Sequence, residues 1–117
     1  MLWVARALAT IVALEHVYFF VLECFLWTTP FGRRTFGTTP ELAESTAAMM
    51  KNQGTYNAFL AAGIGFGMWR DDWTVVLFFL FCVVVAGIVG AATVKRTILF
   101  VQALPAALAI AAVVATR

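Results

Sequence analysis

The chain has 117 residues, of which 63% are hydrophobic and 12% charged, and its mean hydropathy is +0.94. A soluble domain of about this length buries only about two-thirds of the surface that its unfolded chain exposes, so it could not hide this many apolar side chains. The composition therefore argues against a soluble fold and makes the lipid bilayer the expected partner. A net charge of +2 without a basic run argues against a nucleic-acid partner.

The apolar residues are gathered into stretches that are long enough to cross a membrane. A helix needs about 20 residues to cross the hydrocarbon layer. Four stretches meet this need, and the predicted spans are residues 3–28, 52–69, 73–94 and 97–116. The sequence thus predicts an all-α fold in which residues 1–117 form one four-helix transmembrane bundle with no soluble domain.

Proline, glycine and helix-capping residues mark the end of the first span and the start of the second helix. Pro30 and Gly32 are expected to end the first span and to open a loop over residues 31–38. Thr38 and Glu41 have the spacing of a capping box for a helix from about residue 40 to residue 69. That helix would be about 45 Å long, so its first part is expected to lie among the headgroups. Pro105 is expected to kink the fourth span.

The first span is interpreted as a retained helix. A cleaved signal peptide needs a positive start and an uninterrupted apolar stretch. Here only Arg6 precedes the stretch, and Glu15 and His16 interrupt it.

Basic residues suggest an orientation for the four spans. An even number of spans puts both termini on one side of the membrane, with loop 1 (residues 31–38) and loop 3 (Lys95 and Arg96) on the other. Basic residues are more frequent on the loop side, where they are Arg33, Arg34, Lys51, Lys95 and Arg96. The positive-inside rule then predicts cytoplasmic loops and external termini.

Small residues recur at a spacing of four, which lets membrane helices approach closely. The pairs are Ala61 and Gly65, Gly63 and Gly67, Ala86 and Gly90, and Gly87 and Ala91. Packing inside one monomer is the favoured interpretation, and a homo-oligomer face is the alternative.

Polar residues inside the predicted spans point to a specific role, because placing ionisable groups in a bilayer costs free energy. His16 and Glu23 are seven positions apart and share a helix face, with Glu15 beside it. We predict a polar cavity that opens toward loops 1 and 3, with the five basic residues at its rim. The candidate ligand-binding residues are Glu15, His16, Glu23, Asn52, Gln53, Tyr56, Asn57 and Gln102.

Known catalytic and metal-binding patterns do not account for these residues. One histidine and scattered glutamates match no metal-ligand spacing, so neither a metal nor a cofactor is assigned. Cys24 and Cys82 are expected to be inert thiols. No catalytic triad, phosphate loop or dinucleotide fingerprint is present, and an enzyme is not the favoured interpretation.

Three functions fit the predicted cavity. The favoured one is binding of a small polar or amphipathic ligand, extended to proton-linked transport, with Glu23 as the titrating group. The second is a membrane-embedded enzyme that uses His16 and Glu23 as acid and base on a lipid-soluble substrate. The third is a structural or partner-binding subunit in which the polar groups join helices to one another.

The motifs also resemble one bacterial family, the small integral membrane proteins of domain of unknown function 1304. The resemblance rests on Ala-Leu-Glu-His at 13–16, Glu23, Trp27 with Thr29-Pro30, Phe36-Gly37, Asn-Gln-Gly-x-Tyr-Asn-x-Phe-Leu-Ala-Ala-Gly at 52–63, Ala86-Gly87, Gly90-Ala91 and Val-Gln-Ala-Leu-Pro-Ala at 101–106. It implies a four-helix protein of the bacterial inner membrane, with the eight candidate residues as a family signature. It implies no known activity, substrate or cofactor.

Overall fold

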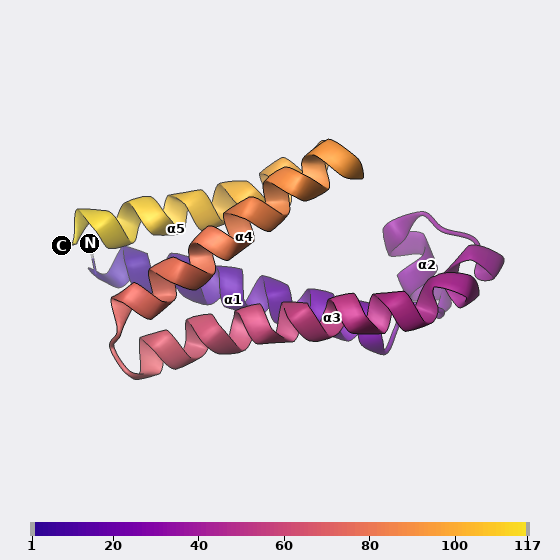
Figure 1. The fold of residues 1–117 in the computed structure, drawn as a ribbon, viewed down its shortest axis with the longest axis horizontal. Helices are drawn as coiled ribbons and strands as arrows, with labels where there is room; N and C mark the ends of the chain where they lie inside the picture. The colour runs from indigo at the N-terminus through magenta and orange to yellow at the C-terminus, as the bar shows by residue number, and fades with distance from the viewer. Residues whose placement is uncertain (1, 117) are drawn as a thin grey trace. The chain divides into compact units, whose positions relative to one another are not determined.

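The computed structural model describes residues 2–116, which hold five α-helices and one π-helical segment and no strand. The elements are α1 (Leu2–Cys24), α2 (Pro30–Phe36), α3 (Pro40–Trp69), α4 (Trp73–Thr93), η1 (Leu99–Ala103) and α5 (Leu104–Ala115) (Figure 1). The predicted all-α class is therefore confirmed.

The chain divides into two compact units. The first, which we call the bundle unit, is Met1–Leu14 with Leu60–Arg117. The second, which we call the loop unit, is Glu15–Phe59. Helices α1 and α3 each contribute one part to both units.

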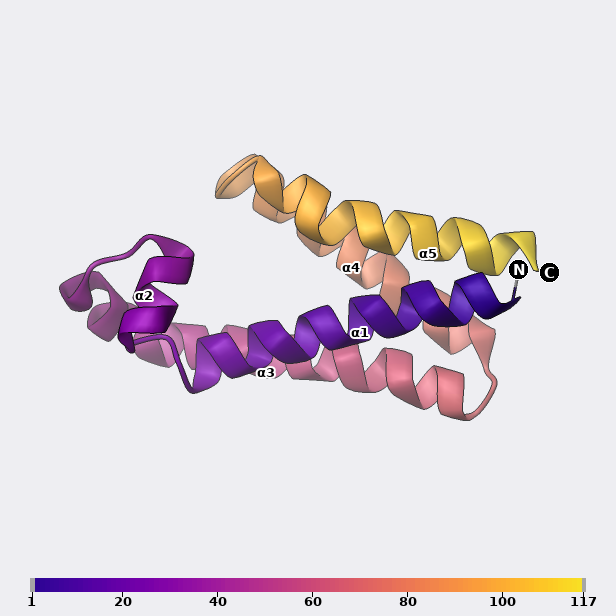
Figure 2. The same ribbon diagram turned by 180° about the vertical axis from the view of Figure 1, so that it is seen from behind.

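The bundle unit is built around a core to which all four of its long helices contribute. On α1, Ala5, Ala9 and Val12 recur at the spacing of one helix face and are fully buried. In this unit α5 runs beside both α4 and the first part of α1 (Figures 1 and 2). The other buried core residues are Ile64, Val76, Leu80, Val83, Ala106, Ala109, Ala112 and Val113.

Glycines let the helices of the bundle unit approach one another closely. A Cβ atom added to Gly87 would lie 2.7 Å from the backbone nitrogen of Ala103, and one added to Gly63 would lie 2.5 Å from the ring of Phe79. Gly65 differs, because a Cβ atom there would meet nothing within 4 Å. Gly63 and Gly87 thus serve packing within this chain, whereas Gly65 faces outward.

A tight turn joins α3 to α4 in the bundle unit. Asp71 has a positive φ of 54°, and the carboxylate of Asp72 caps α4 by accepting from the backbone N–H of Val75 at 3.3 Å. Asp71 also accepts from the indole N–H of Trp73 at 2.9 Å and pairs with Arg6 at 3.2 Å. This network holds the first turns of α1 against the turn.

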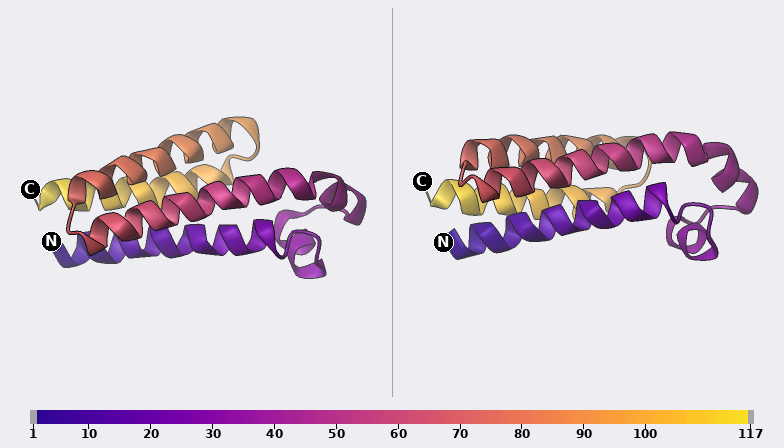
Figure 3. Two further views of the ribbon diagram at one scale, coloured as in Figure 1. Left: turned by 60° about the horizontal axis from the view of Figure 1, so that its bottom comes forward. Right: turned by 90° about the horizontal axis from the view of Figure 1, so that it is seen from below.

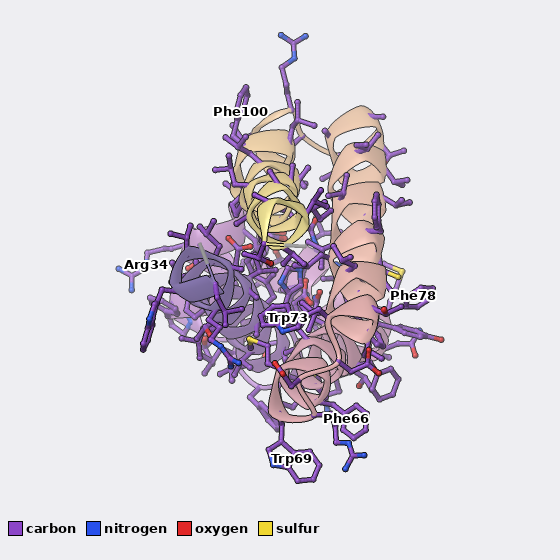
Figure 4. The ribbon with its side chains drawn as sticks, turned by 90° about the vertical axis from the view of Figure 1, so that its left-hand side faces the viewer. Arg34, Phe66, Trp69, Trp73, Phe78 and Phe100 are labelled. Atoms are coloured by element: carbon purple, nitrogen blue, oxygen red, sulfur yellow. The ribbon has the colours of Figure 1, made fainter. Side chains whose placement is uncertain are left out.

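Large apolar side chains cover much of the outer surface of the bundle unit. Phe66, Trp69, Phe78 and Phe100 point away from the helices, while Trp73 points inward (Figure 4). An extended exposed apolar surface marks a protein or membrane contact. Two helices, α1 and α4, are long and apolar enough to cross a membrane, which favours a membrane location.

The first predicted loop is wrong, because residues 30–36 form α2. Thr29 is the N-cap: its hydroxyl accepts from the backbone N–H of Gly32 at 3.2 Å. Pro30 occupies the first turn, where its missing N–H is not needed, and Gly37 ends the helix with a left-handed φ of 64°. Proline and glycine here begin and end a short helix, and α1 stops at Cys24, well before residue 28.

The predicted capping box is also wrong, by one residue. The N-cap of α3 is Thr39, whose hydroxyl accepts from the backbone N–H of Leu42 at 3.2 Å. Thr38 lies outside the helix, and its buried hydroxyl has no hydrogen-bond partner in the part of the chain that the structure describes. The helix itself has the expected bounds, Pro40–Trp69.

The irregularity expected at Pro105 takes the form of a π-helical turn just before it. The backbone N–H of Leu104 donates to the carbonyl of Leu99, five residues back. A proline has no N–H to offer and crowds the turn before it, so a locally wider turn accommodates it without ending the helix.

Candidate functional site

The clearest polar site lies in the loop unit, where the last turn of α1 meets the first half of α3. Gln53 and Asn57 are four residues apart and therefore neighbours on one face of α3. Both direct their side-chain amides at Glu23: Gln53 Nε2 lies 2.9 Å from Oε2, and Asn57 Nδ2 lies 2.5 Å from Oε1. Glu23 is only 4% exposed and Asn57 only 9%. We call these three residues the carboxylate site.

Gly54 allows the two helices to come close enough for these bonds. A Cβ atom at residue 54 would lie 2.7 Å from the sulfur of Cys24 and 3.0 Å from the Cβ of Glu23. The Cys24 thiol in turn donates to the carbonyl of Lys51 at 3.4 Å. Gly54 belongs to the motif at 52–63 but is not among the eight candidate residues, although a glycine inside a helix, at a cost of about 1 kcal/mol relative to alanine, is a recognisable signal.

Among the described residues, the carboxylate site has hydrogen-bond donors but no cation. An ionised carboxylate only accepts hydrogen bonds, so two amide donors suit the charged form of Glu23. Within residues 2–116 the structure pairs Arg6 with Asp71 and pairs no lysine or arginine with Glu23. A buried negative charge without a partner is costly. A proton or a cationic ligand can supply the missing positive charge.

The turn after α1 is attached to α3 and α2 by Trp27. Its indole N–H donates to the hydroxyl of Thr46 at 3.0 Å, and its ring lies 4.7 Å from that of Phe36. Helical spacing alone would put Trp27 on the face of Glu23, one turn further on, but α1 ends at Cys24, so Trp27 does not continue that face. Figure 3 shows α2 beside the end of α1 and the start of α3.

The structure does not bring Asn52 and Tyr56 to the carboxylate site. Both are exposed, and the ring of Tyr56 packs edge-on against Phe59 at 5.7 Å. Each precedes a site residue by one position, and one position turns the side chain by about 100° around the helix. Their neighbours Gln53 and Asn57 therefore face α1 while they do not.

Glu15 and His16 lie two turns before Glu23 on α1. His16 is fully buried, and its ring meets Phe19 edge-on at 5.3 Å. It lies about 10 Å from Glu23 along the helix axis, so one proton could not pass directly between them. Glu15 is half-buried, and its Oε1 has no hydrogen-bond partner within the described residues.

The remaining predicted residues are divided between the two units. Gln102 is partly buried on η1 in the bundle unit, where exposed Lys95 and Arg96 precede that segment. Arg34 and Lys51 are exposed in the loop unit. A common cavity that includes Gln102, with all five basic residues at its rim, stays a prediction.

The histidine, cysteine and acidic side chains of the described residues do not gather into a cluster. Residues 2–116 contain no group of three or more histidine, cysteine, aspartate or glutamate side chains that could hold a metal ion. Cys24 and Cys82 are both free thiols.

Together these features define an all-helical protein with membrane-length apolar helices and a buried carboxylate between two helices. The chain belongs to the family described as protein of unknown function (DUF1304), whose sequence model matches residues 10–114. This confirms the resemblance drawn from the sequence motifs. No curated protein and no solved structure matches the chain.

Proposed function

We propose that the chain is a four-span protein of the bacterial inner membrane that binds a small amphipathic cation, with Glu23 as the counter-ion. The observation that carries the proposal is the buried Glu23 carboxylate, which accepts from Asn57 and Gln53 and has no cationic partner within residues 2–116. Such a group binds a positive charge most strongly in an environment of low dielectric constant.

The four-span arrangement is supported by the helices themselves. Helices α1 and α4 are long and apolar enough to span, and Leu99–Ala115 is a further apolar helical run. The polar residues of α3 keep it from meeting the same test, but Gln53 and Asn57 are directed at α1, which leaves exposed Phe59 and Phe66 to face lipid. With cytoplasmic loops 1 and 3, both termini would lie outside.

The chemistry of the site favours an amphipathic cation over a neutral ligand. Both carboxylate oxygens already accept an amide N–H, so the ligand supplies its positive charge and need not donate a hydrogen bond. The same helix, α1, also carries Phe19 and Phe20 within one turn of Glu23, and aromatic side chains suit the apolar body of such a ligand. A proton would compete with the cation for the same carboxylate, which is the basis for proton-linked transport.

One specific observation favours a second candidate, a purely structural role. The bonds from Gln53 and Asn57 to Glu23 would hold α1 and α3 together even if no ligand bound. The enzyme alternative, with His16 and Glu23 as acid and base, has less support, because about 10 Å of helix separates the two.

A direct binding measurement distinguishes the cation-binding role from the purely structural role. Purified full-length protein in dodecyl maltoside is titrated with tetraphenylphosphonium by calorimetry, and tetraphenylborate provides an anion of the same shape. Wild-type protein should bind the cation and not the anion. Glu23→Gln should abolish binding, while Glu44→Gln, which neutralises an exposed carboxylate on α3, should leave it unchanged.

Two results would decide against the ligand site. Wild-type protein that binds neither probe, or Glu23→Gln protein that binds the cation normally, contradicts it. Loss of helical circular dichroism in Glu23→Gln at temperatures where Glu44→Gln stays folded would support the structural role.

A further inference from the structure

A second polar feature of the loop unit lies at the end of α2, apart from the carboxylate site. A hollow of about 600 Å³ opens there. Its lining residues are Pro30, Arg33, Arg34, Gly37 and Thr38. None of them is acidic.

The backbone around the hollow is held in one conformation by local contacts. The Thr29 hydroxyl donates to the carbonyl of Leu26 at 2.6 Å and accepts from the backbone N–H of Gly32. A Cβ atom at Gly32 would lie 1.9 Å from the Leu26 carbonyl oxygen, so only glycine fits. Gly37 then ends the helix and donates its N–H to the carbonyl of Arg33. The two arginines are thus presented from a fixed turn.

The two guanidinium groups have unused hydrogen-bond donors. Arg33 Nη1 donates to the carbonyl of Thr28 at 3.0 Å, which orients its guanidinium and leaves other N–H groups available. Arg34 has no hydrogen bond or ion pair within the described residues, and its side chain points away from the ribbon (Figure 4). A guanidinium group matches the geometry of phosphate oxygens, to which it donates in pairs.

Exposed aromatic side chains accompany the arginines. Phe25 is 67% exposed, Phe31 46% and Phe36 38%. Aromatic and basic residues together mark segments that lie at the level of lipid headgroups. A ligand that carries both a phosphate group and acyl chains would satisfy both sets of side chains.

We propose that this hollow binds the phosphate group of an anionic phospholipid headgroup. Arg33 and Arg34 donate to the phosphate oxygens, and Phe31 contacts the acyl chains. The site depends on a membrane location of the loop unit and does not depend on ligand binding at Glu23.

Short-chain lipids test the site on the purified full-length protein. Dioctanoyl phosphatidylglycerol, dioctanoyl phosphatidylcholine and inorganic phosphate are each titrated against protein in dodecyl maltoside, with thermophoresis as the readout. Phosphatidylglycerol should bind most tightly. Arg34→Gln should weaken its binding by about tenfold or more, since hydrogen bonds between charged groups are lost. Arg96→Gln, which removes an exposed charge outside the hollow, should not change it.

Several results would overturn the proposal. Equal losses in Arg34→Gln and Arg96→Gln would show that only the overall positive charge attracts the lipid. Inorganic phosphate that binds as tightly as phosphatidylglycerol would show a free-anion site, and equal binding of phosphatidylcholine would show no preference for an anionic headgroup. Arg34→Gln should also keep tetraphenylphosphonium binding, which separates this site from the carboxylate site.

Discussion

Asn57 and Glu23 are 34 positions apart in the sequence, yet the amide nitrogen of Asn57 lies 2.5 Å from Oε1 of Glu23. Neither side chain is more than 9% exposed. The bond is therefore buried, and a buried polar group that loses its partner lowers the free energy of unfolding. This one contact ties the last turn of α1 to the first half of α3.

Removing the Asn57 amide should destabilise the protein more than removing the Gln53 amide. Asn57→Leu leaves a buried carboxylate oxygen without its donor, at a cost of about 1–3 kcal/mol. Gln53 is exposed, so a water molecule can donate to the carboxylate in place of its amide in Gln53→Leu. Unfolding by sodium dodecyl sulfate in mixed micelles, followed by circular dichroism, measures both. A larger loss in Gln53→Leu would contradict the buried geometry.

Gly54→Ala should destabilise the contact between α1 and α3. The added Cβ atom would lie 2.7 Å from the Cys24 sulfur, 3.0 Å from the Glu23 Cβ and 3.3 Å from the Phe20 carbonyl oxygen. Crowding of this kind costs about 1–3 kcal/mol. Thermal unfolding in detergent should show a lower midpoint than for the wild type.

Gly65→Ala is the matched control on the same helix. A Cβ atom there meets nothing within 4 Å, and alanine is the better helix former by about 1 kcal/mol. We expect an unchanged or higher midpoint. Similar losses at Gly54 and Gly65 would mean that the close approach of α1 and α3 is not what Gly54 provides.

Alanine substitutions at two glycines of the bundle unit should lower the stability of the protein by different amounts, measured by the same thermal unfolding. In Gly87→Ala the new Cβ atom is 2.7 Å from the backbone nitrogen of Ala103, which cannot move without shifting η1. In Gly63→Ala it meets the far end of the Phe79 ring, which can turn aside. We expect a loss of about 1–3 kcal/mol at Gly87 and a smaller one at Gly63. The reverse order would contradict the packing of α4 on η1.

The ion pair between Arg6 and Asp71 should contribute little to stability. The two side chains are 41% and 71% exposed, and exposed pairs are worth about 0–1 kcal/mol. Arg6→Gln also loses the stacking on Trp73, at 5.5 Å from the ring centroid. We expect a change in the free energy of unfolding below about 1 kcal/mol. A much larger change would show that this end of the bundle unit depends on the pair.

The sequence predicts the long helices well because their apolar runs and their charged turns are unambiguous. The helix over residues 40–69 and the turn at residues 70–72 are found at the expected positions. The sequence does not predict α2, because Pro30, Gly32 and Gly37 are as frequent in loops as at helix ends. In the structure the helix is capped locally, because the Thr29 hydroxyl accepts from the backbone N–H of Gly32 and Gly37 takes a left-handed φ at its end.

The candidate site is predicted in part for a similar reason. The sequence groups Glu23, Gln53 and Asn57 in one predicted polar cavity, and the structure brings these three together. Asn52 and Tyr56 lie next to Gln53 and Asn57 in the sequence and share a broad polar stripe with them on α3, yet the structure leaves both exposed. The polar residues cover a wider arc of α3 than the arc that contacts α1. The sequence alone therefore does not show which of them face α1.

The most direct test of a cation site at Glu23 is the pH dependence of tetraphenylphosphonium binding in detergent. A proton and a cation would compete for one carboxylate, so affinity in the wild type should fall as the pH is lowered. Glu23→Gln should show no binding at any pH, and Glu44→Gln should follow the wild type. Binding that does not change with pH, or that survives in Glu23→Gln, would contradict the account.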